Sequence, residues 1–362
     1  MSDKLKVGIL GATGMVGQRF VTLLADHPWF EIKTLAASAR SAGKTYEEAV
    51  GDKWKMDTPM PECVKQMVVK NVADVENVAA DVDFVFSAVN MSKDEIRAIE
   101  EEYAKTETPV VSNNSAHRWT PDVPMVIPEI NSEHFAVIAD QKKRLGTTRG
   151  FIAVKPNCSI QSYTPALAAW MKFEPTQVVV STYQAISGAG KTFRDWPEMV
   201  GNIIPFISGE EEKSEQEPLK VFGHIENGRI VKLESDLKIT SQCIRVPILN
   251  GHTATVFLNF KKDPTKEELI EALREYSGKP QELKLPHAPE HFIQYLEEDD
   301  RPQVLKDVNF EGGMGVSIGR LRRDSIFDWK FVGLSHNTLR GAAGGAVECA
   351  ELLKALGYIQ AK

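Results

Sequence analysis

The sequence predicts an α/β protein with a doubly wound, parallel-sheet domain at the N-terminus and an α+β domain with a mixed sheet after it. In the first 150 residues, short apolar runs alternate with helical patterns, as in successive βαβ units. From about Val178 the strand-like runs become longer and alternate polar with apolar residues, which is typical of a mixed or antiparallel sheet. The chain has 362 residues, of which 42% are hydrophobic, so it is long enough for two domains.

The elements of the first domain follow one another without long interruptions. Each expected strand is a short apolar run, and each expected helix repeats its apolar residues with helical spacing. Because strands alternate with helices, right-handed crossovers should place the strands parallel in one sheet. We expect strands at residues 5–10, 32–37, 83–89 and 109–112, and helices at residues 16–25 and 93–105.

The second half of the chain has a different sequence pattern. A charge-rich stretch at 210–216 predicts a solvated helix face, and the Pro- and Glu-rich stretch at 286–301 predicts an exposed loop. The alanine-rich stretch at 338–356 predicts a helix that packs back on the first domain. The expected strands lie at residues 177–183, 239–246 and 253–261.

These patterns suggest where the domains divide. We expect a first domain of residues 1–155 that is completed by residues 336–362 at the other end of the chain. The second domain would then comprise residues 156–335.

Composition excludes several classes of protein. The formal net charge of −7 argues against a nucleic-acid or anionic-membrane partner. No apolar run approaches the ~18 residues of a membrane span, and the first residues lack a signal-peptide core. The four cysteines, Cys63, Cys158, Cys243 and Cys349, form no CxxC pair, so we expect neither a metal site nor a disulfide framework. A reducing cytoplasm fits this pattern best.

Glycines recur every third residue where the first strand meets the first helix. Gly11, Gly14 and Gly17 form GxxGxxG, a variant of the GxGxxG dinucleotide fingerprint. Glycines let the backbone approach a pyrophosphate, and the helix N-terminus supplies N–H donors to it. The pattern therefore predicts a Rossmann-like nucleotide-binding domain.

The end of the second strand indicates which nucleotide binds. Enzymes that use NAD usually carry an acidic residue there for the ribose 2′-hydroxyl. Residues 36–41 contain no carboxylate but offer Ser38, Arg40 and Ser41. Hydroxyls and a guanidinium suit a 2′-phosphate, so we expect NADP.

Cys158 is the residue that points most directly to chemistry. It follows a strand-like run at 150–154 and precedes a helix-like stretch at 159–171. A thiol in the first turn of a helix feels the positive end of the helix dipole, which favours the nucleophilic thiolate. The alternative is a small, buried core cysteine.

Three polar residues further along the chain would suit such a nucleophile. Gln184 ends a strand-like run, and Arg245 lies among apolar neighbours, where a charged residue usually has a partner. His252 follows a glycine at a turn, and its imidazole titrates near neutral pH, as a general base or acid requires.

From Gly8 to about Gly357 the chain resembles the aspartate-β-semialdehyde dehydrogenase family, in its archaeal and fungal branch. The resemblance rests on five motifs, each with several matching residues. They are Gly11-Ala12-Thr13-Gly14-Met15-Val16-Gly17, Ser112-Asn113-Asn114-Ser115-Ala116-His117-Arg118, Pro156-Asn157-Cys158-Ser159, Gln184-Ala185-Ile186-Ser187-Gly188-Ala189-Gly190 and Ser335-His336-Asn337-Thr338.

The resemblance implies a role for each matching residue. Cys158 matches the nucleophile, His252 the acid/base and Gln184 the residue that orients the reacting carbonyl. Arg245 matches the arginine that binds the substrate carboxylate. Glu210 and Lys213 match residues near the substrate amine and phosphate, although neighbouring glutamates and lysines leave their register open. Asn157 and Arg118 match phosphate-site residues.

The resemblance also implies how cofactor and subunits are arranged. No metal is expected, and the assembly implied is a homodimer or homotetramer that contacts through the second domain. The residues expected around NADP are Gly11, Thr13, Gly14, Met15, Val16, Ser38, Arg40, Ser41, Ser87, Ser187, Gly188 and Asn337.

The implied reaction is NADPH-dependent reductive dephosphorylation of L-aspartyl-4-phosphate to L-aspartate 4-semialdehyde, with release of inorganic phosphate. It would proceed through a Cys158 thioester and serve the biosynthesis of lysine, threonine and methionine. A thioester divides one difficult step into two easier ones.

Three alternatives stay open. Malonyl-CoA reductase has similar glycine and cysteine motifs, but Asn157 and the Glu-x-x-Lys pair favour a phosphorylated substrate. N-acetyl-glutamyl-phosphate reductase shares the reaction type but fits poorly around Gln184 and Arg245. A non-catalytic NADP-binding scaffold would have no need for Cys158 and His252 together.

Overall fold

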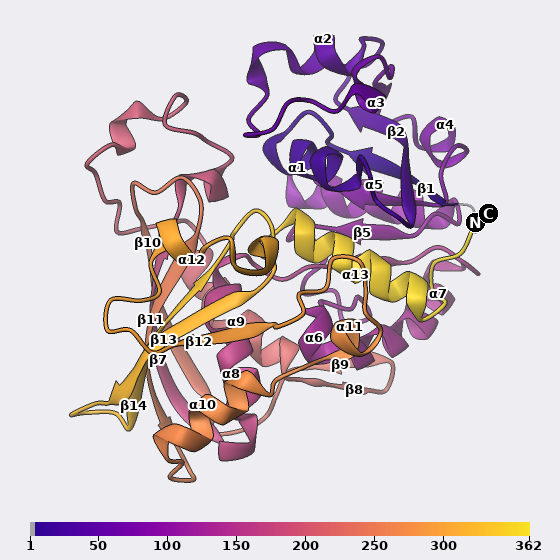
Figure 1. The fold of residues 1–362 in the computed structure, drawn as a ribbon. Coiled ribbons are helices and arrows are strands. Elements are labelled where there is room, and N and C mark those ends of the chain that lie inside the picture. Colours follow the sequence, from indigo (N-terminus) through magenta and orange to yellow (C-terminus); the bar gives the residue numbers. More distant parts are fainter. Residues whose placement is uncertain (1–3) are drawn as a thin grey trace.

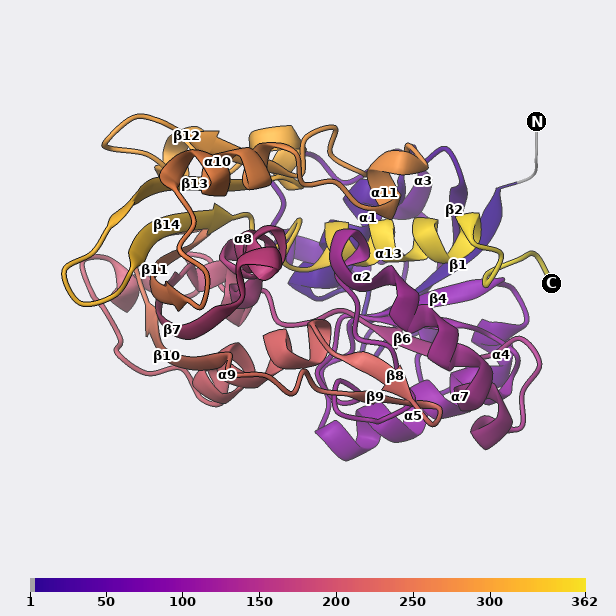
Figure 2. The ribbon, with the colours of Figure 1, turned by 90° about the horizontal axis from the view of Figure 1, so that it is seen from below.

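The computed structural model describes residues 4–362 and contains two six-stranded sheets. Figure 1 shows the sheets in separate parts of the molecule, with the C-terminal helix α13 (Ala343–Ala355) running between them. Viewed from below in Figure 2, α13 lies along the N-terminal sheet, and the N- and C-terminal ends of the chain are on the same side. Helix α13 packs against α1, β5, α6 and α11.

The N-terminal sheet is parallel throughout, with the strand order β3-β2-β1-β4-β5-β6. This is the doubly wound order in which the strand sequence reverses next to β1, and a ligand crevice forms at that switch point. The predicted parallel α/β domain is therefore confirmed. The strands are β1 (Leu5–Leu10), β2 (Phe30–Ala37), β3 (Lys70–Asn71), β4 (Phe84–Ser87), β5 (Val110–Ser112) and β6 (Ile152–Val154).

Helices pack around this sheet. Helix α5 begins at a capping box in which Ser92 accepts the Glu95 N–H and Glu95 accepts the Ser92 N–H. The helices of this domain are α1 (Met15–Leu24), α2 (Tyr46–Val50), α3 (Glu62–Lys65), α4 (Val75–Ala79), α5 (Lys93–Lys105), α6 (Pro128–Asn131) and α7 (Ile138–Leu145).

The second sheet is mixed, as predicted, with the order β10-β7-β11-β14-β13-β12. Strand β10 runs parallel to β7 and β12 parallel to β13, while the other pairs are antiparallel. Along β11, buried residues alternate with half-buried ones, so one face of the strand is more open than the other. The strands are β7 (Pro175–Gln184), β10 (Lys238–Arg245), β11 (His252–Phe260), β12 (Ile293–Leu296), β13 (Val316–Arg323) and β14 (Trp329–Ser335).

Helices and a small hairpin complete this region. The Trp170 indole N–H donates to the carbonyl of Leu269 at 2.9 Å and so ties α8 to α10. The remaining elements are α8 (Thr164–Trp170), α9 (Glu210–Val221), α10 (Lys266–Arg274), α11 (Lys279–Glu282), α12 (Val304–Asp307) and the strands β8 (His224–Glu226) and β9 (Arg229–Val231).

Three local predictions were wrong. The helix expected after Cys158 is broken at Tyr163 into a 3₁₀ turn, η3 (Ser159–Ser162), and α8. The stretch at 210–216 opens α9, whose polar side chains are partly buried rather than solvated. The stretch at 286–301 contains β12, because it pairs with β13 to complete the sheet.

A fully buried ion cluster fixes α13 to the rest of the molecule. The Arg340 guanidinium donates to Glu129 of α6 and to Glu348 of α13, each at 2.7 Å. Burial raises the pKa of Glu348 well above its ordinary value, although the positive charge of Arg340 acts in the opposite direction. The cluster thus joins α6 to α13 and to the segment that leads into it.

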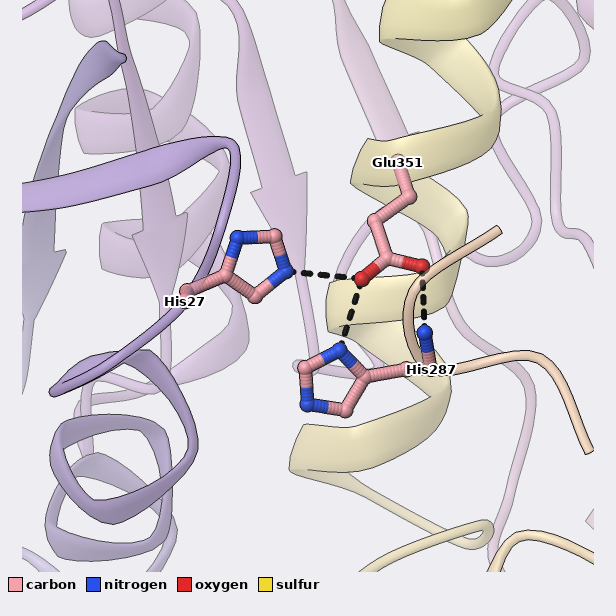
Figure 3. A group of neighbouring side chains, drawn as sticks. All are labelled: His27, His287 and Glu351. Carbon is pink, nitrogen blue, oxygen red and sulfur yellow. Dashed lines mark hydrogen bonds and ion pairs between the residues drawn. The ribbon is translucent and has the colours of Figure 1, made fainter. Parts of the chain in front are cut away.

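A second junction involves two histidines and one carboxylate, drawn in Figure 3. Glu351 of α13 lies 2.7 Å from His27 Nε2 and 2.6 Å from His287 Nδ1. The N–H groups of Trp29 and Phe30 donate to His27 Nδ1, which leaves the ring proton on Nε2, facing Glu351. That nitrogen has no lone pair for a metal, so the cluster is a hydrogen-bonded junction and not a metal centre.

Removing the arginine of the ion cluster should destabilise the protein strongly. Arg340→Met leaves Glu129 buried without a partner, and we expect it to lower the free energy of unfolding by about 3–5 kcal/mol. Glu348→Gln is the matched control, because it keeps the Arg340–Glu129 pair and the size of the side chain, and it should cost less than about 1 kcal/mol. Urea unfolding of both variants measures the difference, and equal losses would contradict this account.

Candidate active site

Three strand ends bring polar side chains to one edge of the second sheet. Gln184 ends β7, Arg245 ends the neighbouring parallel strand β10, and the two are paired in register. His252 begins β11, which runs antiparallel to β7 and pairs Thr253 with Tyr183. The sheet register therefore places Gln184, Arg245 and His252 together, although they are far apart in the sequence.

Cys158 approaches this edge from the loop after β6. Its Sγ lies 3.3 Å from His252 Nε2. The opposite ring nitrogen, Nδ1, accepts the backbone N–H of Ala185 at 3.1 Å. Burial, and then the positive charge of Arg245, lower the pKa of His252 to about 3, so the ring is neutral near pH 7. A neutral imidazole with an accepting Nδ1 carries its proton on Nε2, which points at the sulfur.

The backbone of one residue, Ala185, orients both the histidine and the arginine. The Ala185 N–H fixes the His252 ring, and the Ala185 carbonyl accepts a hydrogen bond from Arg245 Nη1 at 2.7 Å. Gly188 lies directly against both side chains: a Cβ there would be 3.0 Å from Arg245 Nη1 and 3.2 Å from His252 Cε1. Any larger residue at position 188 would crowd the site.

The electrostatics of Cys158 differ from the sequence prediction. Burial first, and then the negative charge of Glu210, raise the pKa of the Cys158 thiol to about 11, while Lys155, Arg118 and Arg245 act in the opposite direction. This direction is opposite to the one expected from a helix N-terminus. Only a four-residue 3₁₀ turn follows Cys158, and burial is the largest contribution to the shift of its pKa.

Helix α9 presents a buried polar stripe to the cysteine loop. Glu210 accepts a hydrogen bond from the Asn157 side-chain amide at 3.0 Å, and Glu217 accepts the Asn157 backbone N–H at 2.6 Å. Between them, Ser214 Oγ lies 3.1 Å from Ser159 Oγ. These three residues of α9 thus hold both sides of Cys158.

The sequence prediction missed Ser214, and it gave Glu217 only as an alternative to Glu210 in the same stretch. The available signal was the spacing of residues 210, 214 and 217, which lie on one face of a helix. Pro218 is a second signal: it lacks the N–H that would bond to the Ser214 carbonyl, and that carbonyl instead accepts the Tyr163 hydroxyl at 2.7 Å.

The residues predicted for the phosphate lie close to this stripe. Arg118 is buried and donates to Glu217 at 3.0 Å and to the Lys155 carbonyl at 3.0 Å. Lys213 donates to Glu210 at 2.7 Å. Lys213 and Glu217 line a cavity of about 310 Å³ together with Ser115.

A separate cavity of about 260 Å³ lies at the switch point of the N-terminal sheet. Gly11 has a φ of +81° and approaches the Ala88 carbonyl so closely that a Cβ would lie 2.3 Å from its oxygen. Helix α1 begins at Gly14 with no side-chain cap, which leaves its first N–H groups for a ligand. The cavity is lined by Gly11, Thr13, Gly14, Ala37, Ser38, Arg40, Val72, Ala88, Val89, Asn90 and Met91.

This lining fits NADP. It contains no carboxylate, and Ser38 and exposed Arg40 offer donors suited to a 2′-phosphate. Of the other predicted residues, Met15 and Val16 form the first turn of α1, and Ser41 follows Arg40 outside the lining.

The last predicted cofactor residues are hydrogen-bonded to neighbouring loops. Ser87 ends β4 and lies 3.1 Å from the Asn114 amide. Asn337 donates to Ser187 Oγ at 2.8 Å and accepts the Gly251 N–H at 2.8 Å, so it joins the loop before α13 to the loop after Gln184.

The raised pKa of Cys158 predicts slow alkylation in the ligand-free protein. At pH 8 only about one thiol in a thousand is ionised, and the labelling rate should rise about tenfold for each unit of pH until near 11. Exposed Cys63 should therefore react before Cys158. Iodoacetamide labelling with peptide mass spectrometry measures both rates.

Glu210→Gln removes the negative charge that opposes ionisation of Cys158. We expect alkylation of Cys158 to become roughly threefold to tenfold faster at fixed pH. Glu212→Gln, an exposed change on the same helix, is the control and should leave the rate within about twofold. A slower Cys158 in Glu210→Gln would show that the carboxylate does not oppose the thiolate.

Comparison with known proteins identifies the family. Residues 6–138 match the semialdehyde dehydrogenase NAD-binding domain, and residues 165–340 match the semialdehyde dehydrogenase dimerisation domain. The aspartate-semialdehyde dehydrogenase of Methanothermobacter thermautotrophicus is 43% identical over 352 residues, which cover 96% of this chain and 99% of the relative. That of Schizosaccharomyces pombe is 43% identical over 353 residues, covering 96% and 97% of the two chains.

Solved structures agree with the sequence comparison. The Candida albicans aspartate-semialdehyde dehydrogenase, solved with NADP, superposes with a TM-score of 0.87 at 38% identity and covers 99% of this chain and 100% of that one. The Vibrio cholerae enzyme II, complexed with ASA, gives a TM-score of 0.74 at 25% identity, covering 98% and 99%. With near-complete coverage by relatives at this identity, the chain belongs to the aspartate-semialdehyde dehydrogenase family.

Proposed function

We propose that this NADP-dependent oxidoreductase converts L-aspartyl-4-phosphate to L-aspartate 4-semialdehyde through a thioester on Cys158. The observation that carries the proposal is the 3.3 Å approach of Cys158 Sγ to His252 Nε2, beside Gln184 and Arg245. Homologues with this activity cover nearly the whole chain, and two of the solved relatives hold NADP or ASA. The reaction belongs to the biosynthesis of lysine, threonine and methionine from aspartate.

In the first step, Cys158 Sγ attacks the acyl carbon of the substrate. The S–C bond forms, the C–O bond to phosphate breaks, and the thiol proton leaves with the phosphate, because His252 Nε2 already carries a proton. Arg245 binds the α-carboxylate with its planar guanidinium, and Gln184 orients the carbonyl. Arg118, Lys213 and Asn157 receive the departing phosphate.

In the second step, the thioester becomes the semialdehyde. NADPH, when bound, supplies a hydride to the thioester carbon. The His252 Nε2–H donates a hydrogen bond to the oxygen that becomes negative and stabilises it without losing its proton, within a buried, water-poor site. When the carbonyl re-forms, the C–S bond breaks, the electron pair stays on the sulfur, and the thiolate takes up one proton from solvent.

Phosphate-site residues favour an acyl phosphate over an acyl-CoA. Arg118 and Lys213 are each paired with a carboxylate, Glu217 and Glu210, and a departing phosphate can take over part of that pairing. With a CoA thioester the leaving group would be an uncharged thiol, which cannot form an ion pair with Arg118 or Lys213.

Assembly and location complete the proposal. The second region matches a dimerisation domain, and the more open face of β11 in that region supports a homodimer or a dimer of dimers. We take residues 1–155 with residues 336–362 as the NADP-binding domain and residues 156–335 as the catalytic and dimerisation domain.

No helix within residues 4–362 is long and apolar enough to cross a membrane. We propose the cytoplasm as the location, because its reducing conditions keep Cys158 free.

The reverse reaction tests the function directly. The protein should reduce NADP⁺ when given L-aspartate 4-semialdehyde and inorganic phosphate, and Cys158→Ala should abolish this activity while leaving the NADPH dissociation constant within about twofold. Malonyl-CoA offered with NADPH in parallel should give no comparable turnover. Activity that persists in Cys158→Ala would eliminate the thioester.

Cofactor choice is tested at Arg40. Arg40→Ala should raise the KM for NADPH roughly tenfold or more, since a hydrogen bond to a charged group contributes about 1.5–3 kcal/mol. The KM for NADH should change far less, because NADH lacks the 2′-phosphate. Equal effects on the two cofactors would mean that Arg40 does not contact that group.

A further inference from the structure

The Glu217 side chain lies between Arg118 and the loop that carries Cys158. Its side chain is buried, and each carboxylate oxygen has a different partner. Oε1 accepts Arg118 Nη1 at 3.0 Å, and Oε2 accepts the Asn157 backbone N–H at 2.6 Å. Arg118 follows β5 in the N-terminal region, Asn157 directly precedes the nucleophile, and Glu217 belongs to α9.

We propose that Glu217 is a positioning residue that holds the phosphate-binding arginine in a fixed relation to the Cys158 loop. This inference rests on the proposed function. Glu217 contacts neither Cys158 nor the residues that bind the α-carboxylate, so it acts through Arg118 and Asn157.

The contacts of Arg118 support this role. Nε donates to the Lys155 carbonyl at 3.0 Å and Nη1 to Glu217, so two anchors on different segments fix the plane of the guanidinium. Nη2 has only a long contact of 3.5 Å with the Asn113 carbonyl. The remaining N–H groups are therefore available to a phosphate in a set orientation.

The same helix also holds the main chain of this loop. Lys220, one turn after Glu217, is buried and directs Nζ to the carbonyls of Arg118, Thr120 and Val123 at 2.5, 3.4 and 3.3 Å. Glu217 thus fixes the Arg118 side chain while Lys220 fixes its backbone. Helix α9 carries the whole arrangement, including the contacts of Glu210 and Ser214 with residues 157 and 159.

The test is steady-state kinetics of the full-length protein with semialdehyde, NADP⁺ and varied inorganic phosphate. Glu217→Gln keeps the size of the side chain, but its amide NH₂ would face one of the two N–H groups that the carboxylate now accepts. We expect the KM for phosphate to rise at least tenfold, the KM for semialdehyde to stay within twofold, and kcat to fall. Glu217→Asp, which keeps the charge but is too short to reach both partners, should give the same raised phosphate KM.

A double-mutant cycle separates positioning from general effects. In an Arg118→Ala background, Glu217→Gln should change the phosphate KM less than twofold, because the residue through which it acts is gone. Glu234→Gln removes the same charge from an exposed position outside this cavity and should leave the phosphate KM within twofold.

The possible results are distinguishable. An unchanged phosphate KM in Glu217→Gln, an equal rise in Glu234→Gln, or additive effects with Arg118→Ala would each overturn the positioning role. Loss of thermal stability in Glu217→Gln with a normal phosphate KM would likewise reduce Glu217 to a structural ion pair. Wild-type protein without phosphate-dependent NADP⁺ reduction would instead overturn the proposed function itself.

Discussion

The contact between α9 and the loop around Cys158 is the interaction on which the rest of the site depends. It buries Glu210 and Glu217 against polar groups of Asn157 and Arg118. Buried carboxylates are costly unless each oxygen is paired, and here each of the two side chains uses both oxygens. Moving any one of these segments would leave a charge without a partner, so the packing fixes them together.

The burial of the site also shifts the pKa values of Cys158 and His252. Low access of water raises the pKa of Cys158 and lowers that of His252, so the pair rests as thiol and neutral imidazole rather than as an ion pair. The cations Lys155, Arg118 and Arg245 oppose this effect without reversing it.

Long-range junctions keep the two sheets in a fixed relation. The Arg340 cluster and the Glu351 junction both anchor α13, one to α6 and the other to His27 and His287. In the Glu351 junction both carboxylate oxygens have partners, whereas in the Arg340 cluster Glu348 Oε1 is buried without one. Asn337, which lies just before α13, donates a side-chain hydrogen bond to Ser187. The position of α13 is therefore coupled to the loop that follows Gln184.

Much of the fold was determined by the sequence alone, because it depends on local patterns. The apolar run at 5–10, the helix at 93–105 and the alternating strand at 253–261 were located correctly from the periodicity of a few neighbouring residues. The glycines around Gly11 and the missing carboxylate near Arg40 likewise pointed to NADP, since a tight turn and a phosphate contact each need particular residue types at adjacent positions.

Only the tertiary structure decided the electrostatics and the supporting residues. A helix dipole argument from residues 158–171 gave the opposite direction for the pKa of Cys158, because burial and the charge of Glu210, which is distant in the sequence, raise it. Residues 210–216 were expected to be solvated, whereas α9 packs against β10 and the turn after Cys158. Glu217 meets Arg118 across 99 positions and Asn157 across 60. Such pairings depend on how the domains pack, and no local pattern encodes them.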